Sequence, residues 1–214
     1  MFNHTRPLFI TFLILLLSGC ETVYFEAAEK VGFHKRDIMV SRVTAAKESQ
    51  EEAQKQFASA LEAFSHELNF SGGDLEDKYK KLNGVYEDSV SGAEEVKNRI
   101  DKVESVSDAL FDEWAQELKQ YKNQSLRRSS EQKLRETKRR YKRFLSAMHA
   151  AEEKMEPVLA VLHDNVLYLK HNLNAMAIAS LKGEVRNLEK DVDSLIREME
   201  LAIKEADSFI ASLK

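Results

Sequence analysis

Apolar residues recur every seven positions through most of the chain, and this spacing is typical of long helices that pack side by side. Between the recurring positions the residues are mainly charged or polar. A sustained seven-residue repeat predicts a narrow apolar seam and a left-handed supercoil. One line comprises Tyr79, Tyr86, Ala93, Ile100, Ser107, Trp114 and Tyr121. A second comprises Leu134, Tyr141, Met148, Met155, Leu162, Leu169 and Met176.

Three breaks divide this pattern. Gly72 and Gly73 precede Asp74, a residue type that caps helices. The second break lies near residues 121–125, where Ser125 or Ser129 is the expected cap, and the third lies near residues 171–174. We therefore expect helices over about residues 23–68, 74–121, 126–171 and 175–213. Pro157 should kink the third helix without ending it.

Helices of similar length joined by short connections pack as antiparallel neighbours. The predicted fold class is all-α, an elongated antiparallel four-helix bundle or coiled-coil rod. Its N-terminal end, second connection and C-terminus should lie at one end of the rod. The other two connections should lie at the opposite end.

Residues 1–19 have the features of a secretory signal peptide. Arg6 supplies positive charge, residues 8–17 are mostly apolar, and Ser18 and Gly19 are small. The apolar run is too short to cross a bilayer. We expect residues 1–19 to be removed and residues 20–214 to form a single helical domain.

The sequence Leu17-Ser18-Gly19-Cys20 resembles the lipobox of bacterial lipoproteins. This resemblance implies cleavage between Gly19 and Cys20, lipidation of the Cys20 sulfur and acylation of the new amino terminus. Several acyl chains, such as palmitate, would hold the protein firmly on a membrane. Glu21, where an aspartate would resemble an inner-membrane retention signal, favours the periplasmic face of the outer membrane. An uncleaved signal or a non-lipidated secreted protein is the alternative.

Composition limits the classes of function. The formal net charge is −4, and removal of the leader, which carries Arg6 and no acid, brings it to −5. Such a balance argues against general nucleic-acid binding. Cys20 is the only cysteine, so the mature chain has no thiol for a disulfide or a nucleophile.

Motifs that mark common catalytic and metal sites are missing from the sequence. It contains no phosphate-binding loop ending in Gly-Lys-Ser/Thr, no His-Glu-x-x-His and no paired Glu-x-x-His. We therefore expect no enzyme, no cofactor and no metal.

A dense basic cluster opens the third predicted helix. Two interpretations are attraction to anionic lipid headgroups and ion pairing with the acidic residues of the preceding helix, which we favour. A protein or polyanion ligand is a third. The cluster comprises Arg127, Arg128, Lys133, Arg135, Lys138, Arg139, Arg140, Lys142 and Arg143. The acidic residues are Glu104, Asp108, Asp112, Glu113 and Glu117.

A polar cluster lies near the end of the same helix. It could form a polar pocket at the distal end of the rod. The interpretation we favour is that it provides helix caps and a few hydrogen bonds in the core. Its members are His163, Asp164, Asn165, Lys170, His171, Asn172 and Asn174.

Three further stretches resemble an uncharacterised bacterial lipoprotein family that is catalogued as a domain of unknown function. They are Ser125-Leu126-Arg127-Arg128 and residues 136–141 and 166–174, and the resemblance covers nearly the whole mature chain. Some members are labelled DNA repair ATPases. This label is not carried over, because the chain has an export signal and lacks a nucleotide-binding loop. The resemblance implies no particular activity.

These observations favour a non-enzymatic, membrane-anchored scaffold or adaptor of the cell envelope. Its partners would be membrane lipid, through acylated Cys20, and an envelope protein of unknown identity. The alternative is an envelope protein that binds a ligand or acts as a chaperone. Pairing between two copies through the less regular first helix stays open, and an envelope enzyme is the least favoured.

Overall fold

Four long helices make up nearly all of the structure, a computed structural model that describes residues 25, 32, 34–69, 74–172 and 174–213. The helices are α3 (Lys35–Asn69), α4 (Leu75–Glu117), α5 (Gln124–His171) and α6 (Ala175–Leu213). The described residues include no strand, so the predicted all-α class is confirmed. The longest helix, α5, has 48 residues, which corresponds to about 72 Å.

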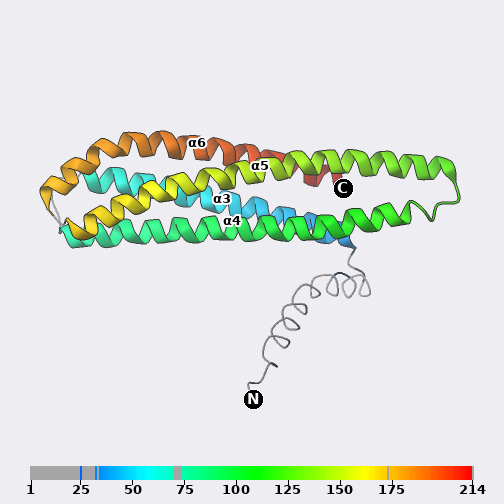
Figure 1. Ribbon diagram of the computed structural model, residues 1–214, viewed down its shortest axis with the longest axis horizontal. Helices are drawn as coiled ribbons and strands as arrows, with labels where there is room; N and C mark the ends of the chain where they lie inside the picture. Colours follow the sequence, from blue (N-terminus) through cyan, green and yellow to red (C-terminus); the bar gives the residue numbers. More distant parts are fainter. Residues whose placement is uncertain (1–24, 26–31, 33, 70–73, 173, 214) are drawn as a thin grey trace, which may run out of the picture.

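Consecutive helices run in opposite directions and close into a ring (Figure 1). Helix α3 packs against α4 and α6, and α5 packs against the same two helices. The α4–α5 connection lies at one end of the rod, and the steps from α3 to α4 and from α5 to α6 lie at the other (Figure 1). This arrangement confirms the predicted antiparallel four-helix bundle. We call the end of the rod that carries the α4–α5 connection the α4–α5 end.

The seven-residue repeat marks the core well, although not at its ends. Ile100, Met148 and Leu162 are almost completely buried. Tyr121 and Met176 continue the predicted seams, yet they are 38% and 78% exposed. The reason is that Tyr121 lies beyond the end of α4 and Met176 lies in the first turn of α6.

The helix starts follow from capping side chains. Asp74 caps α4 as expected, because its carboxylate accepts hydrogen bonds from the backbone N–H groups of Glu76 and Asp77. The cap of α5 is Asn123, whereas we expected Ser125 or Ser129. The Asn123 side-chain oxygen accepts from the Ser125 N–H at 2.9 Å. Asparagine caps as well as serine does, so α5 begins at Gln124, slightly before the expected residue.

Residue 23, where we expected the first helix to begin, lies outside the described residues, and Phe25 is helical. Gly32 has a φ of +91°, a left-handed conformation that glycine adopts without steric cost. Helix α3 then begins at Lys35. The expected leader, Gly19, Cys20 and the Gly72–Gly73 turn lie outside the described residues. Within the described part of the chain, no helix is long and apolar enough to cross a membrane.

Pro157 lies inside α5, which continues past it to His171. Its side chain is exposed, and the next residue, Val158, is buried in the core. The proline ring therefore faces away from the other helices. As expected, it does not end the helix.

Candidate functional site

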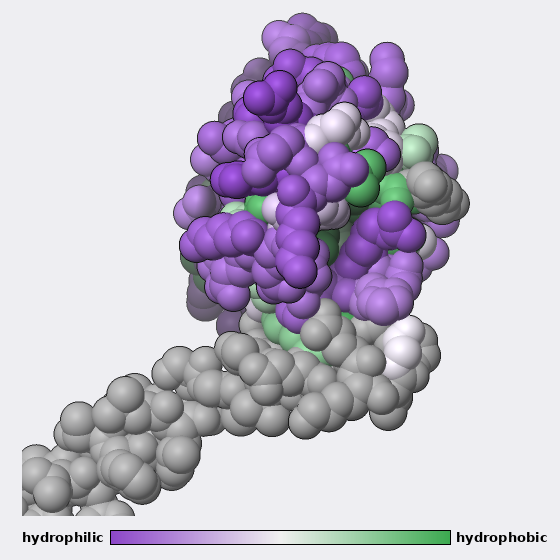
Figure 2. All heavy atoms as spheres, turned by 90° about the vertical axis from the view of Figure 1, so that its right-hand side faces the viewer, coloured by the Kyte–Doolittle hydropathy of each residue, from purple (hydrophilic) through white to green (hydrophobic). Residues whose placement is uncertain are grey.

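The strongest concentration of charge begins at the α4–α5 end and continues along α5. Residues 119–143 contain eleven basic and two acidic side chains. We call this segment the basic surface. Figure 2, which faces this end of the rod, shows mostly hydrophilic residues with small hydrophobic areas among them. The basic surface therefore concentrates positive charge in a protein whose net charge is negative.

An aromatic cluster beneath this segment sets the rotation of α5. The rings of Phe144 in α5 and Phe209 in α6 are stacked, with centroids 5.5 Å apart. Tyr141 packs edge-on against Phe111 of α4 at 5.4 Å. Burial raises the pKa of Tyr141 to about 12, so its hydroxyl stays protonated. With these rings in the core, the positions between them on α5 face outward.

The acidic residues of α4 do not pair with the basic surface in the structure. Glu113 forms an ion pair with Lys35 of α3 at 3.1 Å. Glu104 lies 3.3 Å from His149, which follows the basic surface on α5. Among the described residues, none of the five acidic α4 residues forms an ion pair with the basic surface. The interpretation that we favoured for this cluster is therefore corrected.

The basic side chains have few other acidic partners. Arg135 pairs with Glu131 of its own helix at 2.8 Å, and Arg143 lies 3.8 Å from Glu205 of α6. Lys138 stacks its ammonium group over the ring of Phe111, 5.3 Å from the centroid. Six further basic residues in the α5 part of this surface form no ion pair with any described residue. These are Arg127, Arg128, Lys133, Arg139, Arg140 and Lys142.

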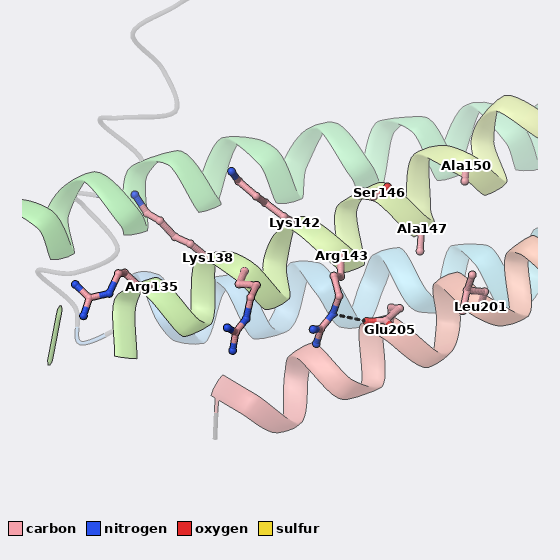
Figure 3. A pocket seen from close by; sticks show the side chains of 10 residues that line it. Arg135, Lys138, Lys142, Arg143, Ser146, Ala147, Ala150, Leu201 and Glu205 are labelled. Carbon is pink, nitrogen blue, oxygen red and sulfur yellow. Dashed lines mark ion pairs between the residues drawn. The ribbon is translucent and has the colours of Figure 1, made fainter. Parts of the chain in front are cut away.

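A groove of about 810 Å³ lies on this face, between α5 and α6. Figure 3 shows Arg143 directed toward Glu205 of α6, and Lys138 and Lys142 directed toward α4. Small residues of α5 and Leu201 of α6, which is 47% exposed, form its apolar part. Glu205 is the only acidic residue of the lining that the structure describes. The groove lining is Arg135, Lys138, Arg139, Lys142, Arg143, Ser146, Ala147, Ala150, Leu201 and Glu205.

Anion binding is the chemistry that this arrangement supports. Arginine stays protonated at any physiological pH, and its planar guanidinium can donate two parallel hydrogen bonds to a phosphate or carboxylate group. Several such groups with few acidic partners create a positive potential that attracts anions. The basic surface is therefore the candidate site.

A second groove, of about 580 Å³, lies between α4 and α5 and has the opposite charge. Its lining includes Glu94, Asp101, Glu152, Glu153 and Glu156. Five carboxylates in one groove oppose the positive charge of the basic surface farther along α5. The two grooves together give the rod an uneven distribution of charge.

His149 joins α5 to α4 beside this acidic groove. Its Nδ1 lies 3.0 Å from a carboxylate oxygen of Glu152, and its Nε2 lies 3.3 Å from a carboxylate oxygen of Glu104. Burial alone would lower the pKa of His149, but the hydrogen bonds to Glu152 and Glu104 raise it above its usual value. Protonated His149 therefore strengthens the contact between the two helices.

The predicted polar cluster near the end of α5 does not converge on one pocket. The side chains of His163 and Asp164 are 51% and 83% exposed and lie 3.9 Å apart. His163 packs its ring against Tyr86 of α4, with centroids 5.4 Å apart. Asn172 donates a hydrogen bond to the Tyr168 carbonyl, while His171 is exposed in the last turn of α5. These contacts fit the capping interpretation.

A buried ionic cluster connects α3 to α4 at the opposite end from the basic surface. The Lys81 ammonium lies 2.6 Å from a carboxylate oxygen of Glu67, and the Lys78 ammonium donates to the Glu67 carbonyl. The hydrogen bond from Lys81, against the effect of burial, lowers the pKa of Glu67. Because Glu67 is 8% exposed and Lys78 is 4% exposed, this cluster supports the fold and offers little surface to a ligand.

The residues that the structure describes contain no group of three His, Cys, Asp or Glu side chains placed to hold a metal ion.

The sequence interpretation did not include Leu201 and Glu205 in the candidate site. Their spacing of four residues puts them on one face of α6, but only the packing of α6 against α5 reveals which face. No signal in the sequence identified them.

A protein-family model matches most of the chain. The sequence model of the family described as "Protein of unknown function (DUF2959)" matches residues 24–213. No curated protein matches the chain. The matched region includes all four helices and the whole basic surface. Because the match covers far more than half of its length, the chain belongs to the DUF2959 family.

Proposed function

We propose that this protein is a lipid-anchored component of the bacterial cell envelope that acts as a non-enzymatic scaffold or adaptor. The observation that carries the proposal is Leu17-Ser18-Gly19-Cys20, directly after a short apolar run. Acylated Cys20 would attach the protein to the membrane without crossing it. Glu21 favours the periplasmic face of the outer membrane.

The form of the bundle supports a scaffold role. Helices of 35 to 48 residues extend over about 50 to 70 Å, so the rod offers long charged faces to partners. A polypeptide partner held along such a face would be linked to the membrane through Cys20. The chain lacks the catalytic motifs considered above, which favours binding over catalysis.

The lipid anchor is tested by comparing the wild-type protein with Cys20→Ala in cells fed a labelled fatty acid. The wild type should carry the label, begin at Cys20 and sediment with membranes. Cys20→Ala should carry no label and keep its leader. Ser18→Ala, which keeps a small residue beside the cleavage site, is the matched control and should behave like the wild type. An unlabelled wild-type protein would contradict the anchor.

The scaffold role is tested by photo-crosslinking in cells from exposed positions on α4 and α5. A defined envelope protein captured in stoichiometric amounts, and lost from Cys20→Ala, would support the role. Capture of no protein from any face of the rod would refute it.

A ligand-binding or chaperone-like envelope protein is the second candidate function. The observation that favours it is the acidic groove between α4 and α5, which is large enough for a small cationic ligand. Hydrogen exchange of the purified protein with and without spermidine tests it. Selective protection of residues 149–159 would support this candidate, and unchanged exchange would refute it for polyamines.

A further inference from the structure

We propose that the basic surface docks on a membrane that contains anionic phospholipids. The ligand is the phosphate of the lipid headgroup, and Tyr121 and Leu126 enter the interfacial layer. This inference rests on the proposed function for the position of the lipid anchor. The charge and the exposed apolar residues at the α4–α5 end are independent of that anchor.

Charge complementarity is the first argument. Eleven of the 25 residues in the basic surface are basic, and two are acidic. Of the basic residues in this segment, Arg135 and Arg143 alone form ion pairs with described residues. The other basic groups of α5 are therefore available for phosphate. Clusters of this kind beside a membrane anchor are typical of segments that bind anionic lipid.

The second argument is the combination of apolar and basic residues at the α4–α5 end. Tyr121 is 38% exposed and Leu126 is 57% exposed, and both lie among basic residues. The other exposed large apolar side chains lie outside residues 119–143; they are Leu167, Tyr168, Met176 and Leu201. Lys122 and Arg127 flank them in the sequence. Tyrosine favours the membrane–water interface, and long basic side chains reach from there to the headgroups. A purely polyanionic ligand would offer no apolar contact to the exposed side chain of Leu126.

The third argument is position. Helix α3 begins near the α4–α5 end, since Lys35 forms an ion pair with Glu113 in the last turns of α4. Cys20 precedes Lys35 by fifteen residues, a segment that can span at most about 50 Å. Residues 124–143 of α5 extend over about 30 Å. A lipid at Cys20 would therefore keep this part of α5 close to the membrane surface.

The arguments together predict how the rod meets the membrane. The α4–α5 end and the adjoining outer face of α5 contact the headgroups. The other end, with Glu67 and the start of α6, points away. The acidic groove between α4 and α5 then lies farther from the anionic surface than the basic surface does.

The experiment uses purified lipidated protein reconstituted into vesicles of phosphatidylcholine, or of phosphatidylcholine and phosphatidylglycerol in a ratio of 3:1. A fluorophore is attached at Ser125→Cys, beside Leu126, or at Ser91→Cys on α4 as the control position. Both serines are exposed. Cys20 does not react, because its sulfur is acylated. Lipids with a quencher near the headgroup report contact with the membrane.

We expect quenching at residue 125 in vesicles with phosphatidylglycerol, and its loss in pure phosphatidylcholine or at 1 M salt. Residue 91 should show no quenching in either. The variant Arg127→Gln/Arg128→Gln/Arg139→Gln should lose the signal at residue 125. A matched variant with the same change in charge should keep it. This control is Lys55→Gln/Lys80→Gln/Lys182→Gln, at exposed positions outside the basic surface.

Anchored protein with equal signals in both vesicle types would overturn the docking inference and leave the lipid anchor intact. Protein purified without acyl groups would instead contradict the proposed function. In that case, flotation of the same protein with phosphatidylglycerol vesicles, and not with phosphatidylcholine vesicles, would still support docking. A response to polyglutamate without any response to vesicles would assign the surface to an acidic protein and overturn the inference.

Discussion

Gln50 is an uncharged polar residue in the middle of an apolar core, and replacing it with methionine should stabilise the protein. Its side chain is completely buried in α3. Neither Nε2 nor Oε1 has a hydrogen-bond partner among the described residues. Methionine has nearly the same length and shape, so Gln50→Met removes the amide and leaves the packing almost unchanged.

The expected gain follows from the cost of burying an unpaired amide. A buried polar group without a partner costs about 1–3 kcal/mol. We therefore expect Gln50→Met to raise the free energy of unfolding by about 2 kcal/mol. For a protein of this size, 1 kcal/mol corresponds to a shift of about 2–4 °C in Tm, which gives a rise of about 4–8 °C.

Thermal and urea unfolding followed by circular dichroism measure this difference. Gln116→Met is the matched control, because Gln116 is exposed on α4 and its replacement should change stability by less than about 0.5 kcal/mol. If Gln50→Met is less stable than the wild type, the amide must be paired with internal water and the reasoning is refuted. Size-exclusion chromatography checks that the variant keeps its oligomeric state, since a buried polar residue can specify helix pairing.

Three further changes test the packing, the capping and the pH dependence. Leu162→Ala should lower the free energy of unfolding by about 2–5 kcal/mol in urea because Leu162 is completely buried, whereas Leu201→Ala at a 47% exposed position should have little effect. Asn123→Ala should lower the thermal stability by about 1 kcal/mol through the lost cap of α5, while Ser129→Ala, which we had also considered as a cap, should not. The raised pKa of His149 gives stability that is present below its unfolded pKa of about 6.5 and is lost as the pH rises through the higher folded pKa. In urea titrations, the free energy of unfolding of the wild type should therefore exceed that of His149→Gln by more at pH 6 than at pH 9. An equal difference at the two pH values would contradict the ion pairs of His149 with Glu104 and Glu152.

The sequence was sufficient to predict the helices and most of the core, because the seven-residue spacing of apolar residues determines both. Residues such as Met148 and Leu162 repeat every seven positions and must meet the other helices to leave water. The rule weakens where a helix ends, since burial then depends on the next helix. Tyr121 and Met176 therefore continue the seam in sequence without entering the core.

The ion pairs were much harder to predict. Opposite charges on adjacent helices suggested contacts between α4 and α5, but Glu113 pairs with Lys35, 78 positions away in the sequence. A long side chain reaches several neighbours, and small rotations of each helix decide which one it meets. The basic character of the candidate surface was visible in the sequence, whereas the contribution of Leu201 and Glu205 required the packing of α6.

The ring of helices has a consequence for the order of folding. Helix α3 packs against α6, so the first of the four helices needs the last one to complete its buried face. Lys47 of α3 and Asp207 of α6, whose side chains lie 2.8 Å apart, are separated by 160 positions. Such distant contacts close slowly, because a long loop must lose entropy before any of them forms. A nascent chain that still lacks α6 therefore exposes the apolar stripes of α3 and α5 to aggregation until α6 has been synthesised.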